Sequence, residues 1–152
     1  GGIGCIYVGG DSDIEQKEKF DRVDDSVCAV RSALQEGIIP GGGLALWRLA
    51  PDLEKACDYP EEDIANRILS ATLKSPLLQI MENAGLDGES IMDQPDLIDD
   101  THGFDVKNEK YGDMFKMGVI DPLKVTKNAL INAVSVATTI LSTNAIVTHA
   151  RA

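Results

Sequence analysis

The sequence has little positive charge, and it lacks the short motifs of several common enzyme sites. Its net charge of −11 at pH 7 disfavours a nucleic-acid-binding protein, because such proteins usually carry a basic patch. No basic amphipathic stretch predicts binding to a membrane surface. There is no G-x-x-x-x-G-K-[ST], no G-x-S-x-G and no H-E-x-x-H. The acidity does not exclude a small anionic ligand, since local backbone dipoles and a bound cation matter more than the global charge.

Cysteine is scarce and shows no pairing pattern. Cys5, Cys28 and Cys57 have no C-x-x-C spacing, and their number is odd. This favours reduced thiols in a reducing compartment, and we expect them in the core. Neither His102 nor His149 has a partner at metal-ligand spacing, so neither predicts a metal site.

The chain begins without a methionine, a basic segment or a long apolar run. This start does not predict a signal peptide, and we expect an excised fragment. The most apolar stretch, residues 129–147, is interrupted by Asn, Ser and Thr. These polar residues predict a buried helix instead of a membrane span.

Residues 12–36 have the pattern of one long helix. Ser12 and Glu15 have the spacing of a capping box, and Gly37 is typical of the residue that ends a helix. Two acid-first pairs predict an exposed surface: Glu15 with Lys19 and Glu18 with Arg22. An apolar stripe predicts a better-buried second half: Val23, Val27, Val30 and Leu34. Residues 3–8 predict a preceding strand whose partners lie elsewhere.

Three successive glycines, Gly41–Gly43, make the strongest break in the sequence. Their N–H groups can approach a ligand closely at the beginning of the next helix. An ordinary flexible turn has the same composition, and the pattern by itself favours that turn. The helix that follows has an apolar stripe: Leu46, Leu49, Leu53 and Cys57.

The middle of the chain predicts several shorter elements. Acidic residues after Pro60 predict the first turn of a helix that contains Ile64, Ile68 and Leu69. Pro76 predicts the start of another helix, which ends at Gly85. The remaining expectations are a short helix at 90–92, a loop over 95–100, a brief strand or turn over 101–106, and a short helix over 111–117.

The last helix is predicted to begin at Asp121 and Pro122. Aspartate is favoured at the N-cap and proline at the first helical position. Its apolar residues predict burial on most sides, with a stripe at Leu130, Val134, Ala137 and Leu141. Asp121 could cap the helix and also contact a ligand, because a carboxylate has several acceptor positions.

Asp25 lies roughly 200° around the predicted helix from Val23 and so points away from the apolar stripe. A carboxylate there could orient a water for attack on a phosphate. A solvated acid on a highly charged helix fits the same position and is the commoner case.

Three segments together resemble the group I, or GroEL-type, chaperonins. Residues 17–37 carry Arg-Val-Asp-Asp at 22–25, and residues 37–46 carry G-I-I-P-G-G-G. Residues 111–137 carry Y-G-D-M and M-G-V-I-D-P-L-K-V-T. Their order and spacing are similar to the C-terminal third of that family across essentially the whole chain.

The resemblance implies a mainly α fold: a multihelical half of a chaperonin equatorial domain, preceded by a strand–helix segment of the intermediate domain. Residues 1–36 would be the second half of the intermediate domain. Residues 37–152 would be the C-terminal half of the equatorial domain. Gly2 and Gly37 would lie at the hinges between domains.

The resemblance also implies roles for single residues. Asp25 would promote ATP hydrolysis, Gly42 would lie against the nucleotide, Asp121 would bind the ribose hydroxyls, and Val119 would pack on adenine. An Asn-Ala-Ala run of the family lines the adenine pocket, and the aligned residues depart from it: Asp105, Val106 and Lys107. The implied cofactors are ATP and Mg²⁺, with the metal-binding aspartate in a Gly-Asp-Gly-Thr-Thr loop of the N-terminal half.

The implied partners are further copies in a seven-subunit ring, a co-chaperonin lid, and unfolded clients bound by an apical domain. No nucleic-acid or membrane partner is expected. Leu78 replaces an arginine that joins two rings in the bacterial prototype, with Asp87 at the acidic partner position, so that ion pair is not expected in a double ring. The implied location is a bacterial-type cytoplasm or an organelle matrix.

The implied function is part of an ATP-dependent chaperonin that assists protein folding. We expect the complete subunit to be an ATPase and the isolated chain to be inactive. The departure at residues 105–107 leaves a second hypothesis open: a diverged, non-enzymatic chaperonin-like domain for helical interaction or assembly.

Overall fold

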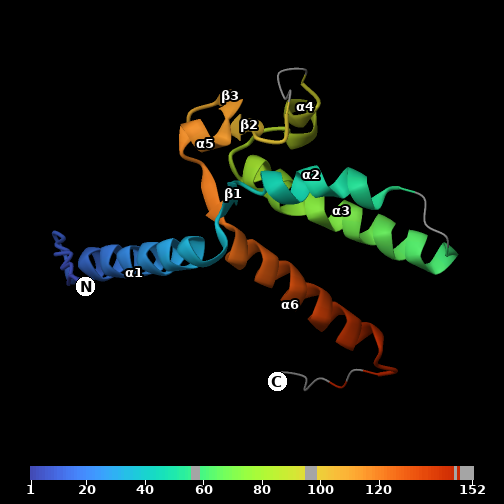
Figure 1. The fold of residues 1–152 in the computed structure, drawn as a ribbon, viewed down its shortest axis with the longest axis horizontal. Coiled ribbons are helices and arrows are strands. Elements are labelled where there is room, and N and C mark those ends of the chain that lie inside the picture. The colour runs from blue at the N-terminus through green and yellow to red at the C-terminus, as the bar shows by residue number, and fades with distance from the viewer. Residues whose placement is uncertain (56–58, 95–98, 146, 148–152) are drawn as a thin grey trace, which may run out of the picture. The chain divides into compact units, whose positions relative to one another are not determined.

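The structure is a computed structural model that describes residues 1–55, 59–94, 99–145 and 147 (Figure 1). The prediction of a mainly helical fold is confirmed, with 62% helix. The chain divides into two compact units, Gly1–Gly37 with Pro122–Ala152, and Ile38–Asp121. The assignment of residues 1–36 and 37–152 to two chaperonin domains stays a prediction.

The first unit contains α1 (Asp13–Glu36), and its limits follow the predicted caps. Ser12 Oγ accepts from the N–H of Glu15 at 3.2 Å, and the Gly37 N–H donates to the carbonyl of Ala33 at 2.7 Å. No residue of α1 is buried, and Leu34 is 83% exposed. The second half is still the better buried of the two, as predicted, because most of the half-buried residues lie there: Val27, Ala29, Ser32 and Ala33.

The same unit contains α6 (Leu123–Leu141), which meets the C-terminal end of α1. The Leu123 N–H donates to the carbonyl of Gly37 at 3.1 Å, Lys124 Nζ donates to Gln35 Oε1 at 2.5 Å, and Lys127 pairs with Glu36. No residue of α6 is buried, so the expected burial on most sides is wrong. In the described part of the chain, no helix combines the length and apolar character needed to cross a bilayer.

The N-terminal segment does not form the strand predicted at residues 3–8. A strand needs a hydrogen-bonded neighbour, and none of the strands of this structure pairs with it. Gln16 Nε2 donates to the carbonyl of Val8 at 3.2 Å, which holds the segment against the start of α1. Cys5 and Cys28 are exposed, which corrects the expectation of core thiols; Cys57 lies outside the described residues.

The second unit is built on α2 (Leu44–Leu53) and α3 (Pro60–Asn83), which lie side by side (Figure 1). Leu44 and Ala50 are the buried residues of α2, and Trp47 packs on the same core. The predicted stripe of α2 is therefore not its buried face, and Leu49 is 49% exposed. The buried face of α2 instead repeats every three residues, beginning with the first residue after the glycine loop.

Pro76 lies inside α3 and does not begin a new helix, contrary to the prediction. One buried row runs along α3 on both sides of the proline: Ser70, Leu73, Leu77 and Met81. A proline inside a helix costs about 3 kcal/mol, because a hydrogen bond is lost and the ring crowds the preceding turn. Packing of the continuous row offsets that cost. The predicted end at Gly85 is confirmed, since α3 ends at Asn83 and Gly85 follows with φ +78°.

Short elements complete this unit. Helix α4 (Gly88–Met92) lies where a short helix was expected, and Asp87 caps it by accepting from the Ser90 N–H. Strands β2 (His102–Asp105) and β3 (Lys110–Asp113) form an antiparallel hairpin. Helix α5 (Met114–Met117) follows and ends at Gly118. Residues 111–113 are thus strand and not helix, because they pair with β2. Pro95 and Asp96, predicted in a loop, lie outside the described residues.

The glycine loop lies between a strand and a helix. Strand β1 (Ile38–Pro40) pairs with β4 (Ile120–Pro122), and the chain then passes through Gly41–Gly43 into α2. The core beside this loop is small: Leu44, Leu77, Met81, Met92 and Met114. The Arg48 guanidinium donates to the carbonyls of Asp99 and His102 at 2.9 and 3.0 Å, which fixes α2 to β2.

Candidate functional site

An open pocket of about 450 Å³ lies within the second unit. Its apolar lining comes from α3, β2, α5 and the residues that follow α5: Leu77, Ile80, Met81, Phe104, Met114, Met117 and Val119. Its polar side comes from the turn after β2: Asp105, Lys107 and Asn108. Gly42, Val106 and Gly118 complete the lining. An apolar pocket of this size with a few polar groups is typical of a small-ligand site.

Five of the predicted ligand-contact residues therefore line one pocket, although they come from three parts of the sequence: Gly42, Asp105, Val106, Lys107 and Val119. Asp121 is not part of the lining, although the backbone of Gly42, which is part of it, lowers the pKa of the Asp121 carboxyl. Asp25 is exposed on α1 and belongs to the other unit. The roles of all seven residues stay predictions.

The glycine loop is held tightly on both sides. The Gly41 N–H donates to the carbonyl of Val119 at 2.9 Å. Gly43 has φ +80°, and a Cβ at this residue would lie 2.8 Å from the backbone nitrogen of Leu77. A side chain at Gly43 would therefore force α2 away from α3. The interpretation as a loose flexible turn does not fit this geometry, since the loop packs closely against two other elements.

Asp121 lies on β4 and does not cap α6. The N-cap residue of α6 is Pro122, and no side chain caps that helix end. Asp121 is partly buried, and burial raises the pKa of its carboxyl above the ordinary value. The Gly42 N–H donates to the carboxylate and lowers the pKa in part. The predicted helix cap is wrong because Asp121 belongs to β4, which pairs with β1, and α6 begins only after Pro122.

The turn after β2 is organised around a buried carboxylate. Asp105 is 7% exposed, and Asn108 Nδ2 donates to its Oδ2 at 2.6 Å. Asp105 Oδ1 accepts from the N–H groups of Lys107 and Asn108 at 2.9 and 3.4 Å. The Asn108 side chain is the main reason that the pKa of Asp105 lies below its ordinary value, although burial opposes the shift.

Sequence reasoning missed Asn108 and the hairpin that presents it. An Asp followed three residues later by Asn between two short runs with aromatic residues is a turn signal that could have predicted the hairpin. Phe104 and Tyr111 face each other across the two strands, with ring centroids 4.9 Å apart. This cross-strand pair was the second available signal.

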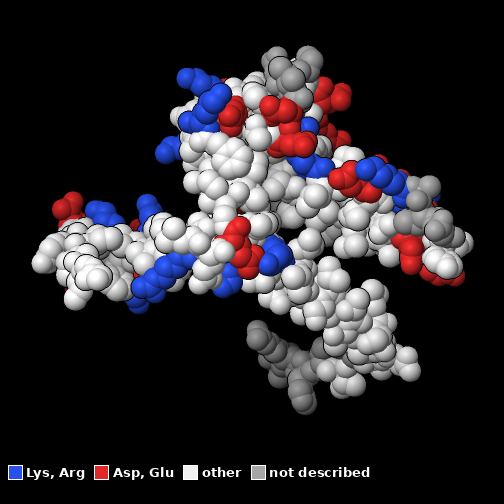
Figure 2. Space-filling model, viewed as in Figure 1, with Lys and Arg blue, Asp and Glu red and all other residues white. Residues whose placement is uncertain are grey.

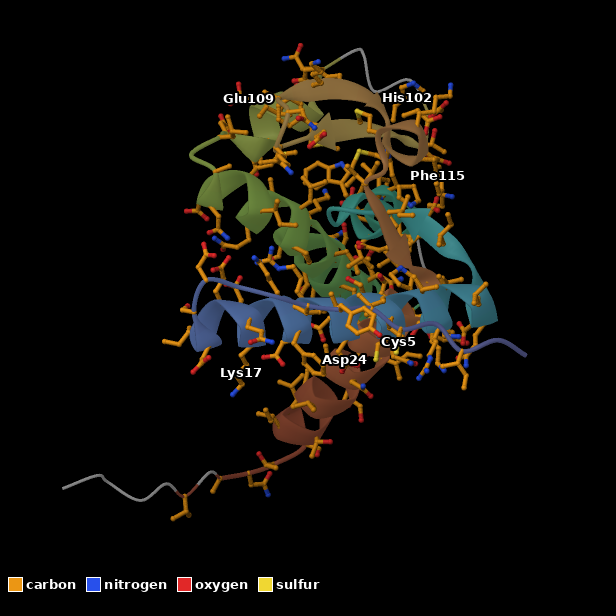
Figure 3. The ribbon with its side chains drawn as sticks, turned by 90° about the vertical axis from the view of Figure 1, so that its left-hand side faces the viewer. Cys5, Lys17, Asp24, His102, Glu109 and Phe115 are labelled. Carbon is orange, nitrogen blue, oxygen red and sulfur yellow. The ribbon has the colours of Figure 1, made fainter. Side chains whose placement is uncertain are left out.

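The described residues gather no group of three or more His, Cys, Asp or Glu that could hold a metal ion. His102 Nδ1 lies 2.6 Å from Asp99 Oδ1, which also accepts from the N–H and the hydroxyl of Thr101. Figure 3 shows His102 and Glu109 at opposite ends of the β2–β3 hairpin.

The fold and the sequence both have known relatives. The chain is similar to a crystal structure of a group III chaperonin in the open state, with a TM-score of 0.77 and 26% sequence identity. The match covers 92% of this chain and 30% of that chain, so this sequence spans less than a third of the length of that relative. The model of the TCP-1/cpn60 chaperonin family matches residues 1–151. The chain therefore belongs to the TCP-1/cpn60 chaperonin family.

Proposed function

We propose that this chain is a C-terminal part of a chaperonin subunit and holds one side of an ATP site in a protein-folding machine. The observation that carries the proposal is the arrangement in the second unit. An apolar pocket lies beside a close-packed glycine loop at the start of α2, and the backbone of Gly42 in that loop acts on the half-buried Asp121 carboxyl. Family membership supports the same conclusion.

The chemistry of these groups fits ATP. Phe104, Val119 and Met117 offer apolar surface suited to a purine. The Asp121 carboxylate has acceptor positions beyond the one that Gly42 occupies, and ribose hydroxyls are suitable donors. The Gly41 and Leu44 N–H groups are already bonded within the protein, so the positive end of the α2 dipole is what this helix start offers a phosphate. When bound, ATP supplies the phosphoryl group whose hydrolysis drives the conformational cycle. We assign the Mg²⁺ ligands to the N-terminal half of the subunit.

Asp25 is proposed to promote hydrolysis, brought to the nucleotide by movement at Gly37. The test compares Asp25→Ala with Asp24→Ala, the adjacent exposed carboxylate on α1, in the full-length protein. We expect Asp25→Ala to lower turnover by about 10²–10⁴-fold, the usual contribution of a general base, while ATP affinity is kept. Asp24→Ala should keep most of the turnover. Near-normal hydrolysis by Asp25→Ala would contradict the proposed role.

The isolated 152-residue chain is expected to show no appreciable ATPase. Robust hydrolysis of Mg²⁺-ATP by the purified chain would contradict the proposal that it holds only one side of the site. The measurement is a steady-state phosphate-release assay with the full-length protein as the positive control.

We further infer a group I subunit in a seven-membered ring with a co-chaperonin lid, with clients bound by an apical domain. The proposed location is a bacterial-type cytoplasm or an organelle matrix. The similar structure is a group III chaperonin, so the ring size is the decisive measurement. Native mass spectrometry of the assembled full-length protein should give seven subunits per ring. Any other number would overturn the group I inference and leave the chaperonin assignment in place.

The second candidate is a non-enzymatic chaperonin-like assembly domain. Asp105 favours it, because three donors of the turn already occupy its carboxylate. Calorimetric titration of the full-length protein with ATP separates the two candidates. Saturable binding supports the ATP site, and no heat of binding supports the assembly domain.

A further inference from the structure

The turn between β2 and β3 forms one side of the pocket. Because Asp105 pairs with Lys110 in the hairpin, the turn consists of residues 106–109. Val106, Lys107 and Asn108 all line the pocket, and Figure 3 shows Glu109 at the tip of the hairpin. Glu109 has φ +53°, which is uncommon for a residue with a side chain. The turn thus has a specific shape that its surroundings must hold.

The side chain that holds this shape is Asp105. Its two oxygens accept three hydrogen bonds, and all three donors belong to the turn: the Lys107 N–H, the Asn108 N–H and Asn108 Nδ2. Asp105 is buried, so these bonds are shielded from water. A carboxylate already bonded in this way has limited capacity to bind a ligand directly. Its position in the pocket lining therefore does not make it a ligand-binding group.

We propose that Asp105 and Asn108 are positioning residues, which hold the turn so that its backbone and the apolar walls select the bound purine. This inference rests on the proposed ATP site. Because Asp105 occupies the N–H groups of Lys107 and Asn108, the carbonyl groups of the turn are the backbone groups available to the purine. A carbonyl held in a fixed position can accept from the 6-amino group of adenine but not from the 6-oxo group of guanine. A site built for one hydrogen-bond pattern rejects the other, because its polar groups would be left unpaired.

The Asp105–Asn108 pair allows a reciprocal exchange. Asp105→Asn weakens the contact, because one amide oxygen must then serve donors that two carboxylate oxygens served. Asn108→Asp places two carboxylates against each other. The double variant Asp105→Asn/Asn108→Asp again places a donor opposite an acceptor, with the net charge of the natural pair. A double-mutant cycle therefore measures the interaction energy between the two residues, separately from the effect of each substitution alone.

The experiment uses the full-length protein with ATP and GTP as probes, titrated by calorimetry, alongside the urea midpoint of each variant. We expect each single variant to weaken ATP binding roughly tenfold, the effect of losing one charge-assisted hydrogen bond, and to reduce the preference for ATP over GTP. The double variant should recover both within about threefold. Asn83→Ala, at the end of α3 and outside the pocket lining, is the matched control and should bind both nucleotides like the natural protein.

Four results would overturn the inference. Single variants that bind ATP and GTP like the natural protein show that the pair has no role in binding. A lower urea midpoint with an unchanged preference shows a purely structural role. Loss of binding in Asp105→Asn but not in Asn108→Asp shows that Asp105 contacts the ligand itself. A double variant as weak as the single ones shows that the two residues do not act as a pair. A natural protein that binds no ATP instead overturns the proposed function, which distinguishes the two failures.

Discussion

The two units of this chain use apolar residues in different ways. In the unit Ile38–Asp121, Leu77 and Met81 are 3% and 1% exposed and belong to a packed cluster. In the other unit, α6 carries a long apolar sequence without any buried residue, and Leu141 is 83% exposed. Figure 2 shows a difference in charge as well: groups of acidic and basic residues are visible over α2 and α3, while the later part of α6 is almost without them. Helix α6 is the more apolar of α3 and α6, yet only α3 has a buried row, so an apolar sequence forms a core only where a second element packs against it.

The largest effect is expected when a buried leucine is replaced by alanine, and the same replacement of an exposed leucine tests the contrast between the two units. Leu77→Ala removes a buried side chain from the core and should lower the free energy of unfolding by about 2–5 kcal/mol. Leu141→Ala removes an exposed side chain and should change it by less than about 0.5 kcal/mol. Urea denaturation followed by circular dichroism measures both. Equal losses would show that α6 is as well packed as α3.

The next prediction separates backbone conformation from close packing. Gly43→Ala should destabilise the chain by about 1–3 kcal/mol, since the residue has φ +80° and its Cβ would meet the backbone of Leu77. Gly85→Ala is the control, because Gly85 has φ +78° and open space around the added carbon. This control variant should lose only the stability that a positive φ costs an alanine. The difference between the two urea midpoints measures the contact of the glycine loop with α3, and a zero difference would contradict it.

A smaller effect is expected from Asp121, whose pKa is raised by burial. The folded chain holds this proton more tightly than the unfolded chain, so ionisation opposes folding. The loss of folding stability is absent below the pKa of the unfolded chain, about 4. It grows as the pH rises towards the pKa of the folded chain, and it is complete above that pKa. Asp121→Asn should therefore gain stability relative to the natural chain as the pH rises, by less than about 1 kcal/mol.

Urea midpoints between pH 3 and pH 7 measure this difference for Asp121→Asn. Asp24→Asn, an exposed aspartate on α1, corrects for the loss of one negative charge. A difference that is constant with pH, or that moves in the opposite direction, would contradict the buried position of Asp121. In the full-length protein the same variant should bind ATP more weakly, because an amide accepts fewer hydrogen bonds than a carboxylate.

The smallest effect concerns the junction of α1 and α6. Lys127→Ala removes the ion pair with Glu36 and should cost a few tenths of a kcal/mol, an effect that 1 M NaCl reduces. Lys124→Ala removes a contact to the neutral amide of Gln35, so salt should change its cost much less. Thermal unfolding at low and high salt measures both. Equal salt dependence of the two variants would show that the Lys127 ion pair does not stabilise the junction.

Local signals in the sequence were sufficient wherever neighbours along the chain decide the outcome. Ser12, Glu15 and Gly37 predicted both ends of α1, because a helix cap involves residues within four positions of each other. The same reasoning failed at Pro76, where the buried row of α3 passes through the proline. It failed again at Asp121, where membership of β4, which pairs with β1, replaced the expected cap.

The pocket could be predicted only in part. Resemblance to the chaperonins suggested Gly42, Val119 and residues 105–107, and the structure places these residues around one pocket. Asn108 could not be assigned in the same way, because its role depends on hydrogen bonds to Asp105 within a four-residue turn. The apolar part of the lining from α3 and α5 also depends on how the hairpin packs beside those helices.

The sequence by itself determined the mainly helical fold, the caps of α1, the break at Gly41–Gly43 and the family. These follow from local backbone preferences and from an ordered set of motifs. The tertiary structure alone decided which apolar faces are buried, that Asp121 meets Gly42, and that Asp105 is bonded to its own turn. The physical reason is that burial and hydrogen-bond pairing depend on a second surface. The sequence of one segment does not specify which surface that is.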